Sequence, residues 1–112
     1  MVINMTELPI MSWSPGQFEA ARKLCTDGII RAYSLPTILP QDNTIYVTGM
    51  ALETEQNIMH QFGTDNIDAI IVQGEPIFVY AFVNACKGEL KKINCYSPCY
   101  DSDGKFVKFR RF

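Results

Sequence analysis

The segment from residue 67 to residue 88 constrains the fold of this chain more than any other. Residues 67–72 (IDAIIV) form a nearly continuous run of branched apolar side chains, which is typical of a central strand covered on both faces. Gln73-Gly74-Glu75-Pro76 interrupts the run, and residues 77–86 are then apolar around most of a helical circumference, until Lys87-Gly88 ends the pattern. The sequence therefore predicts a strand, a tight turn and a buried helix in direct succession.

Two strand-helix pairs are predicted before this unit. Residues 2–5 form an apolar run, and Ser14-Pro15-Gly16-Gln17 has the pattern of a capping box with proline at the first helical position. The helix that follows is expected to stop at Asp27-Gly28, because glycine tolerates the positive φ of a helix end. Residues 29–33 then predict the second strand.

The sequence leaves two interpretations for the start of the second predicted helix. Residues 44–48 have strand composition, whereas Val47 also fits the same helical face as Ala51, Ile58 and Phe62. We favour a helix from about Thr48 to Phe62, ended by Gly63.

The end of the chain predicts two more strands, residues 92–96 and 105–112, joined by a loop or hairpin. Strands and helices then alternate until the last two strands, and this order predicts a mostly parallel sheet with right-handed crossovers. We expect residues 1–112 to form one α/β domain, a small Rossmann-like or flavodoxin-like three-layer domain with an antiparallel C-terminal edge strand.

Composition excludes several classes of protein. Ten Lys and Arg residues against twelve Asp and Glu give a net charge of -2, so the broad basic field used for duplex nucleic-acid binding is missing. The longest apolar run, 77–83, is far shorter than the roughly 20 residues of a membrane-spanning helix. The first residues lack the pattern of a signal peptide, and we expect a cytoplasmic protein with no membrane partner.

The cysteines predict neither disulfides nor a metal site. Cys25, Cys86, Cys95 and Cys99 are expected to be free thiols in a reducing compartment. Cys95 and Cys99 have no second pair of cysteines to complete a zinc site, and His60 is the only histidine. No cofactor is expected either, because the chain lacks both a P-loop and a Gly-x-Gly-x-x-Gly motif.

Four loops are predicted to converge at the carboxyl ends of the parallel strands, where open α/β sheets bind their ligands. These loops are residues 6–17, 34–43, 73–76 and 96–100. The third is the most informative, because Gly74 lets a ligand approach the backbone ahead of a helix N-terminus. Glu75 is either stabilised by that helix dipole or acts as a ribose-hydroxyl acceptor or general base.

Other residues of these loops have both a structural and a binding interpretation. Ser14 and Gln17 cap a helix, and Trp13 either staples that helix to the core or stacks on a base. Hydroxyl groups at strand ends either bind phosphate or stabilise turns. The candidate ligand-binding residues are Thr6, Glu7, Trp13, Ser14, Gln17, Gln73, Gly74, Glu75, Tyr96, Ser97 and Arg110. The candidate catalytic residues are Glu75, Ser97 and Thr6.

The chain resembles the small single-domain CRISPR-associated Rossmann-fold (CARF-type) accessory proteins, including those discussed as ring nucleases. The residues that carry the likeness are Asn4-Met5-Thr6, Trp13-Ser14-Pro15-Gly16-Gln17, Val72-Gln73-Gly74-Glu75 and the closing Phe106 to Phe112. Two turns differ from those relatives: Thr6-Glu7-Leu8 replaces a Ser-x-His-like turn, and Ser97-Pro98-Cys99-Tyr100 lacks an arginine. Both differences fall where a catalytic or phosphate-binding group is expected.

What the resemblance implies is a homodimer that holds a cyclic oligoadenylate, or another small nucleotide, across its two-fold axis. Cleavage or sequestration of this signalling nucleotide stays open, and cleavage without metal requires only in-line orientation and charge stabilisation. One alternative is a non-catalytic dimerisation or protein-interaction module that uses the aromatic closing strand. Another is a small nucleoside- or sugar-processing enzyme that uses Glu75.

Overall fold

The computed structural model describes all 112 residues, and its strands and helices alternate as predicted. A five-stranded sheet has the order β2-β1-β3-β4-β5, in which all pairs are parallel except β4 with β5. The elements are β1 (Val2–Met5), α1 (Pro15–Arg22), β2 (Ile30–Ala32), α2 (Thr44–Phe62), β3 (Ala69–Val72), α3 (Pro76–Lys87), β4 (Asn94–Tyr100) and β5 (Phe106–Arg111). The prediction of a small Rossmann-like α/β domain with an antiparallel edge strand is confirmed.

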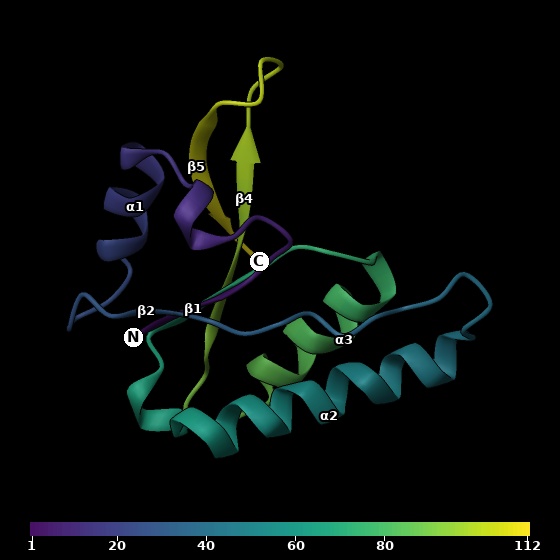
Figure 1. Ribbon diagram of the computed structural model, residues 1–112. Coiled ribbons are helices and arrows are strands. Elements are labelled where there is room, and N and C mark those ends of the chain that lie inside the picture. The colour runs from purple at the N-terminus through teal and green to yellow at the C-terminus, as the bar shows by residue number, and fades with distance from the viewer.

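The helices form one layer on each face of the sheet (Figure 1). Alternate residues of β1 and β3 point to opposite faces, so each strand contributes side chains to two cores. Ile3 and Ile70 pack with the buried side chains of α2 and α3, including Phe78 and Phe82. A smaller cluster on the other face includes Trp13 and lies beneath α1. Because β1 and β3 are covered on both sides, their residues are fully buried.

Helix α1 begins as predicted but lacks half of the predicted capping box. The Ser14 side chain accepts a hydrogen bond from the backbone N–H of Gln17 at 3.2 Å, and Pro15 occupies the first helical position. The Gln17 side chain does not return to the cap, because it is buried and bonds to Tyr100 instead. The helix ends at Arg22, before the predicted stop at Asp27-Gly28.

Helix α2 settles the open assignment of residues 44–48. It begins at Thr44, and the Asn43 side chain accepts a hydrogen bond from the backbone N–H of Tyr46 at 2.8 Å. This cap and the apolar face that continues to Phe62 outweigh the local strand composition. At the other end Gly63 adopts a φ of 82°, which a residue with a side chain rarely accepts.

The prediction of a loop at residues 96–100 is wrong, because these residues belong to β4. The strand continues through Ser97 and Pro98 to Tyr100 and pairs with β5 over this stretch. The pairing between β3 and β4 reaches only Tyr96, so Pro98 lies where β4 has a single bonded neighbour. Proline is tolerated at such a position because fewer ladder hydrogen bonds depend on its missing N–H.

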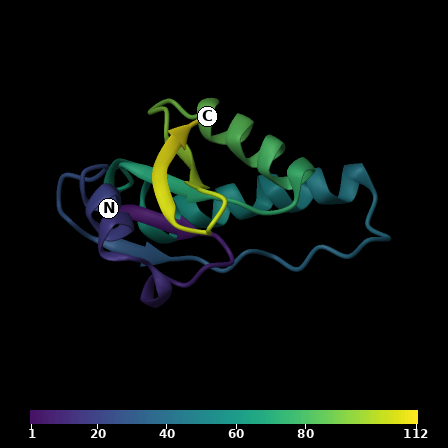
Figure 2. The same ribbon diagram turned by 90° about the horizontal axis from the view of Figure 1, so that it is seen from above.

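The closing strand is covered from within the chain on one face. Phe109 of β5 lies against Trp13, with 6.3 Å between the ring centroids, and against Phe106 at 4.8 Å. Figure 2 shows β5 at the edge of the sheet and the long connection from β2 running out to the start of α2. None of the helices combines the length and apolar composition needed to cross a bilayer.

Candidate functional site

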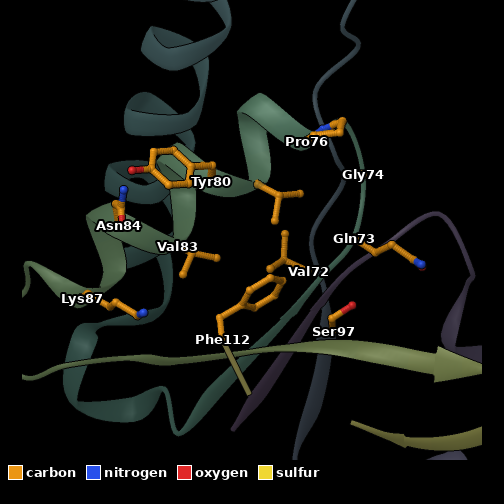
Figure 3. Close-up of a pocket in the computed structure, with 11 residues that line it drawn as sticks. Val72, Gln73, Gly74, Pro76, Tyr80, Val83, Asn84, Lys87, Ser97 and Phe112 are labelled. Atoms are coloured by element: carbon orange, nitrogen blue, oxygen red, sulfur yellow. The ribbon is translucent and has the colours of Figure 1, made fainter. Parts of the chain in front are cut away.

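A pocket of about 450 Å³ lies between α3 and the β3–β4 part of the sheet. Figure 3 shows the side chains that surround it, from α3, the two strands and the end of the chain. The walls are mainly apolar, and a few polar groups converge on the space. The lining residues are Val72, Gln73, Gly74, Pro76, Val79, Tyr80, Val83, Asn84, Lys87, Ser97 and Phe112. This combination is the usual character of a small-molecule site.

Four polar side chains of the pocket have no partner within the chain. The side chains of Gln73, Asn84 and Lys87 are exposed and take part in none of the hydrogen bonds or salt bridges of the structure. The hydroxyl group of half-buried Ser97 is equally free. These groups offer amide, ammonium and hydroxyl donors to a ligand.

Helix α3 positions three of the site residues by their spacing. Tyr80, Asn84 and Lys87 follow one another at intervals of four and three residues, so they share one face of the helix. The opposite face is buried in the core through Phe78 and Phe82. A polar stripe on an otherwise apolar helix therefore points at the pocket and away from the core.

Two exposed aromatic rings border the pocket. Tyr80 is 71% exposed on α3, and Phe112 is 45% exposed after the end of β5. The backbone N–H of Phe112 donates to the carbonyl oxygen of Cys95 at 3.0 Å, which fixes the position of the last residue beside β4. Flat apolar surfaces of this kind suit a ring such as a nucleobase, because stacking needs no specific hydrogen bond.

The turn before α3 separates two pockets. Gly74 lines the pocket described above and also a second one of about 400 Å³, which includes Glu7 and Glu75. A Cβ atom on Gly74 would meet only the methyl groups of Leu35, at 3.6 Å, so alanine fits here without strain. Gly74 is thus a lining residue that the two pockets share.

Glu75 caps α3 with its own carboxylate. Oε1 accepts from the backbone N–H of Ile77 at 3.1 Å, and Oε2 accepts from that of Phe78 at 2.9 Å. The free N–H groups expected at this helix N-terminus are therefore bound within the chain, and the negative charge already complements the dipole. A phosphate at this helix N-terminus would be repelled by the carboxylate of Glu75.

The other predicted residues lie in separate places. Thr6 lies within hydrogen-bond distance of Asn4 Oδ1, at 2.9 Å, and of the Leu8 carbonyl, at 3.2 Å, and so holds the turn after β1. Trp13 is 6% exposed, and it packs edge to face on Phe18 rather than offering its ring to solvent.

A further polar pocket lies beside the β4–β5 turn. Ser14, Gln17 and Tyr100 are among its lining residues, and its volume is about 490 Å³.

Tyr96 points to the opposite face of the sheet from Ser97 and packs against the cluster beneath α1. Arg110 is exposed on β5, directly across from Ser97.

The predicted loops thus converge only in part. The structure brings Gln73, Gly74 and Ser97 together in one pocket and places Glu7 and Glu75 in its neighbour. Among the polar and aromatic residues of the main pocket, sequence reasoning missed four: Tyr80, Asn84, Lys87 and Phe112. The first three carry a readable signal in their helical spacing on an apolar segment. Phe112 carries none, because its place depends on the pairing of β5.

A buried acidic and thiol cluster lies away from this pocket. Glu55 of α2 is 2% exposed, and its Oε1 has no hydrogen-bond partner, whereas Oε2 accepts from Gln56 at 2.9 Å. Burial and the neighbouring carboxyl of Glu89 raise the pKa of Glu55 to about 7. A hydrogen bond with the Cys95 thiol, burial and nearby negative charge raise the pKa of the Cys86 thiol. Both thiols are buried.

The structure contains no group of three or more His, Cys, Asp or Glu side chains that could hold a metal ion. His60 is exposed in the last turn of α2. Comparisons of the chain with protein-family models, with curated proteins and with solved structures found no match.

Proposed function

We propose that this chain binds a cyclic oligoadenylate and that the pocket between α3 and β4 receives one of its nucleosides. The single observation that carries the proposal is the set of unpartnered polar side chains around an apolar space bordered by two exposed aromatic rings. The resemblance to CARF-type proteins implies the same class of ligand.

The pocket residues divide naturally between base and sugar. Tyr80 and Phe112 provide faces for an adenine ring, and Asn84 offers both a donor and an acceptor to its edge. Ser97 and Gln73 offer hydrogen-bonding groups to ribose hydroxyls, and Lys87 carries the only charged side chain of the lining. This cation favours a phosphodiester at the end of the pocket that lies next to the last turn of α3.

The ligand extends beyond a single pocket. A volume of about 450 Å³ is within the range that holds one drug-sized molecule, and a ring of three or more nucleotides is larger than that. The homodimer implied by the resemblance supplies a second copy of the pocket to the same ring. Sedimentation of the chain with and without the ring tests this part of the proposal.

Cleavage, where it occurs, needs no metal in this proposal. The 2′-oxygen of one adenylate attacks the adjacent phosphorus, the bond to the 5′-oxygen breaks, and the proton of the 2′-hydroxyl reaches that oxygen through solvent. The products are a 2′,3′-cyclic phosphate and a 5′-hydroxyl, with no water consumed. Positioning in line and the charge of Lys87 are the contributions available from this chain.

Incubation with cyclic tri-, tetra- and hexa-adenylate without metal tests the proposal. Chromatography and mass analysis of free and protein-bound nucleotide then distinguish a cut ring from an intact bound one. We expect one ring to be recovered bound or linearised. Recovery of all three rings intact and unbound would overturn the proposal.

A pair of tyrosine variants locates the binding. Tyr80→Ala removes one stacking surface and is expected to weaken binding about 5- to 150-fold, which corresponds to roughly 1–3 kcal/mol per stacked base. Tyr46→Ala is the matched control, because Tyr46 is 57% exposed on α2 and lines none of the pockets described here. Equal loss in both variants would show that binding does not use the α3 pocket.

A further inference from the structure

The pocket between α3 and β4 is here called the nucleoside pocket. A separate cationic pocket adjoins it. It has a volume of about 460 Å³ and lies where α3 ends, β4 begins and the chain finishes. Its lining residues are Lys87, Lys92, Ile93, Asn94, Cys95, Arg111 and Phe112. Lys87 and Phe112 belong to both pockets, and Figure 3 shows Lys87 at the edge of the labelled side chains and Phe112 among those in the middle.

The three cations of this pocket are not used by the fold. The only salt bridges in the structure involve the N-terminal amine, so Lys87, Lys92 and Arg111 are all unpaired. No Asp or Glu side chain lines the pocket. Lys87 complements the dipole at the C-terminus of α3, but this explanation does not extend to Lys92 or Arg111, which lie outside the helix.

The net charge of the whole chain conceals this local excess. Seven of the ten Lys and Arg residues fall between positions 87 and 111, against three of the twelve Asp and Glu residues. The other nine Asp and Glu residues lie outside this range, against only three Lys and Arg residues. The near-neutral chain therefore has a C-terminal segment whose net charge is positive and attracts anions.

The opposite end of the nucleoside pocket repels phosphate. Beyond Gly74 lies the pocket that includes Glu7 and Glu75, and the carboxylate of Glu75 already fills the N-terminus of α3. A polyanion that places one nucleoside beside Gly74 can extend favourably only toward Lys92 and Arg111. The acidic pocket on one side and the cationic pocket on the other thus determine the direction in which a bound strand leaves the nucleoside pocket.

We propose that the pocket of Lys87, Lys92, Arg111 and Phe112 is a second nucleotide subsite, which binds the phosphodiester and the next base of a strand whose first nucleoside occupies the α3 pocket. This inference rests on the proposed function and extends it to a run of at least two nucleotides. Phe112 forms the wall between the two subsites, so that successive bases contact the same ring from either side.

Calorimetric titration with adenosine 5′-monophosphate and with linear 5′-phosphorylated diadenylate tests the second subsite. The wild-type chain is expected to bind the dinucleotide at least about tenfold more tightly than the mononucleotide. The double variant Lys92→Gln/Arg111→Gln is expected to lose this gain and to keep its affinity for the mononucleotide within about twofold. It should also lower the slope of log Kd against log salt concentration for the dinucleotide by about one.

The matched control is Lys105→Gln/Lys108→Gln, which removes the same charge from residues outside the cationic pocket. It is expected to retain the dinucleotide gain, and thermal melting checks that both double variants are folded. Equal affinity of the wild type for the two ligands, or equal losses in the two double variants, would overturn the second subsite alone. Absence of any mononucleotide or ring binding by the wild type would instead overturn the proposed function.

Discussion

The replacement of Glu55 by glutamine should change how the stability of this protein depends on pH. Glu55 is buried on α2, and the charged or titratable groups that face it are Glu89, which follows α3, and the Cys86 thiol, while Gln56 donates to its Oε2. A rise in the pKa from 4.5 to about 7 corresponds to about 3 kcal/mol of free energy of unfolding. The folded chain thus favours the protonated carboxyl.

The sign of the effect follows from proton binding. Between pH 4.5 and about 7 the folded state keeps a proton that the unfolded state releases, so stability falls as the pH rises and then levels off above the folded pKa. Glu55→Gln carries no ionisable group. We therefore expect the variant and the wild type to be similar near about pH 4, and the variant to be more stable by about 3 kcal/mol near about pH 8.

Urea denaturation followed by the fluorescence of Trp13 measures this difference, since Trp13 is the only tryptophan and is buried. The control is Glu53→Gln, which changes an exposed carboxyl on the same helix and should leave the pH profile unchanged. A constant difference in stability between Glu55→Gln and the wild type at every pH would show that Glu55 does not titrate with a raised pKa in the folded chain.

Three further predictions concern other contacts. Tyr100→Phe leaves the buried Gln17 amide without its partner and should lower stability by about 1–3 kcal/mol in urea denaturation; an unchanged midpoint would contradict this. Glu75→Ala should cost about 0.5–2 kcal/mol through loss of the α3 cap, and Glu75→Ser should cost less because it keeps a capping oxygen; equal costs would argue against capping. In a thiol-labelling assay Cys86 and Cys95 should react only after denaturation, and rapid labelling of all four cysteines in the folded chain would contradict their burial.

The sequence was sufficient for the order of the elements because that order depends on local patterns. The run at 67–72, the turn with Gly74 and the buried helix after it each follow from neighbouring residues. The errors arose where distant contacts decide. Ser97 and Pro98 look like a loop but are held in β4 by β5, and the Gln17 side chain leaves its local cap because Tyr100, 83 positions away, offers a partner.

The residues of the candidate site were likewise predictable only where a local sequence pattern indicates them. Gln73 and Gly74 were found because the carboxyl end of a central strand is the usual place for a ligand. Lys87 appeared in the sequence only as the end of a helix, and its spacing from Tyr80 and Asn84 is the signal that was available. Phe112 reaches the pocket through sheet pairing alone, which no local pattern reveals.

We propose above that an adenosine nucleotide binds in the pocket between α3 and β4. Amide chemical-shift mapping of the isotopically labelled chain, titrated with cyclic tetra-adenylate, tests it most directly. We expect the largest shifts at Gln73, Gly74, Asn84, Lys87 and Ser97, and no shifts on the exposed outer face of α2. Shifts centred on another surface, or no shifts with this ring or with the tri- and hexa-adenylate rings, would contradict the claim.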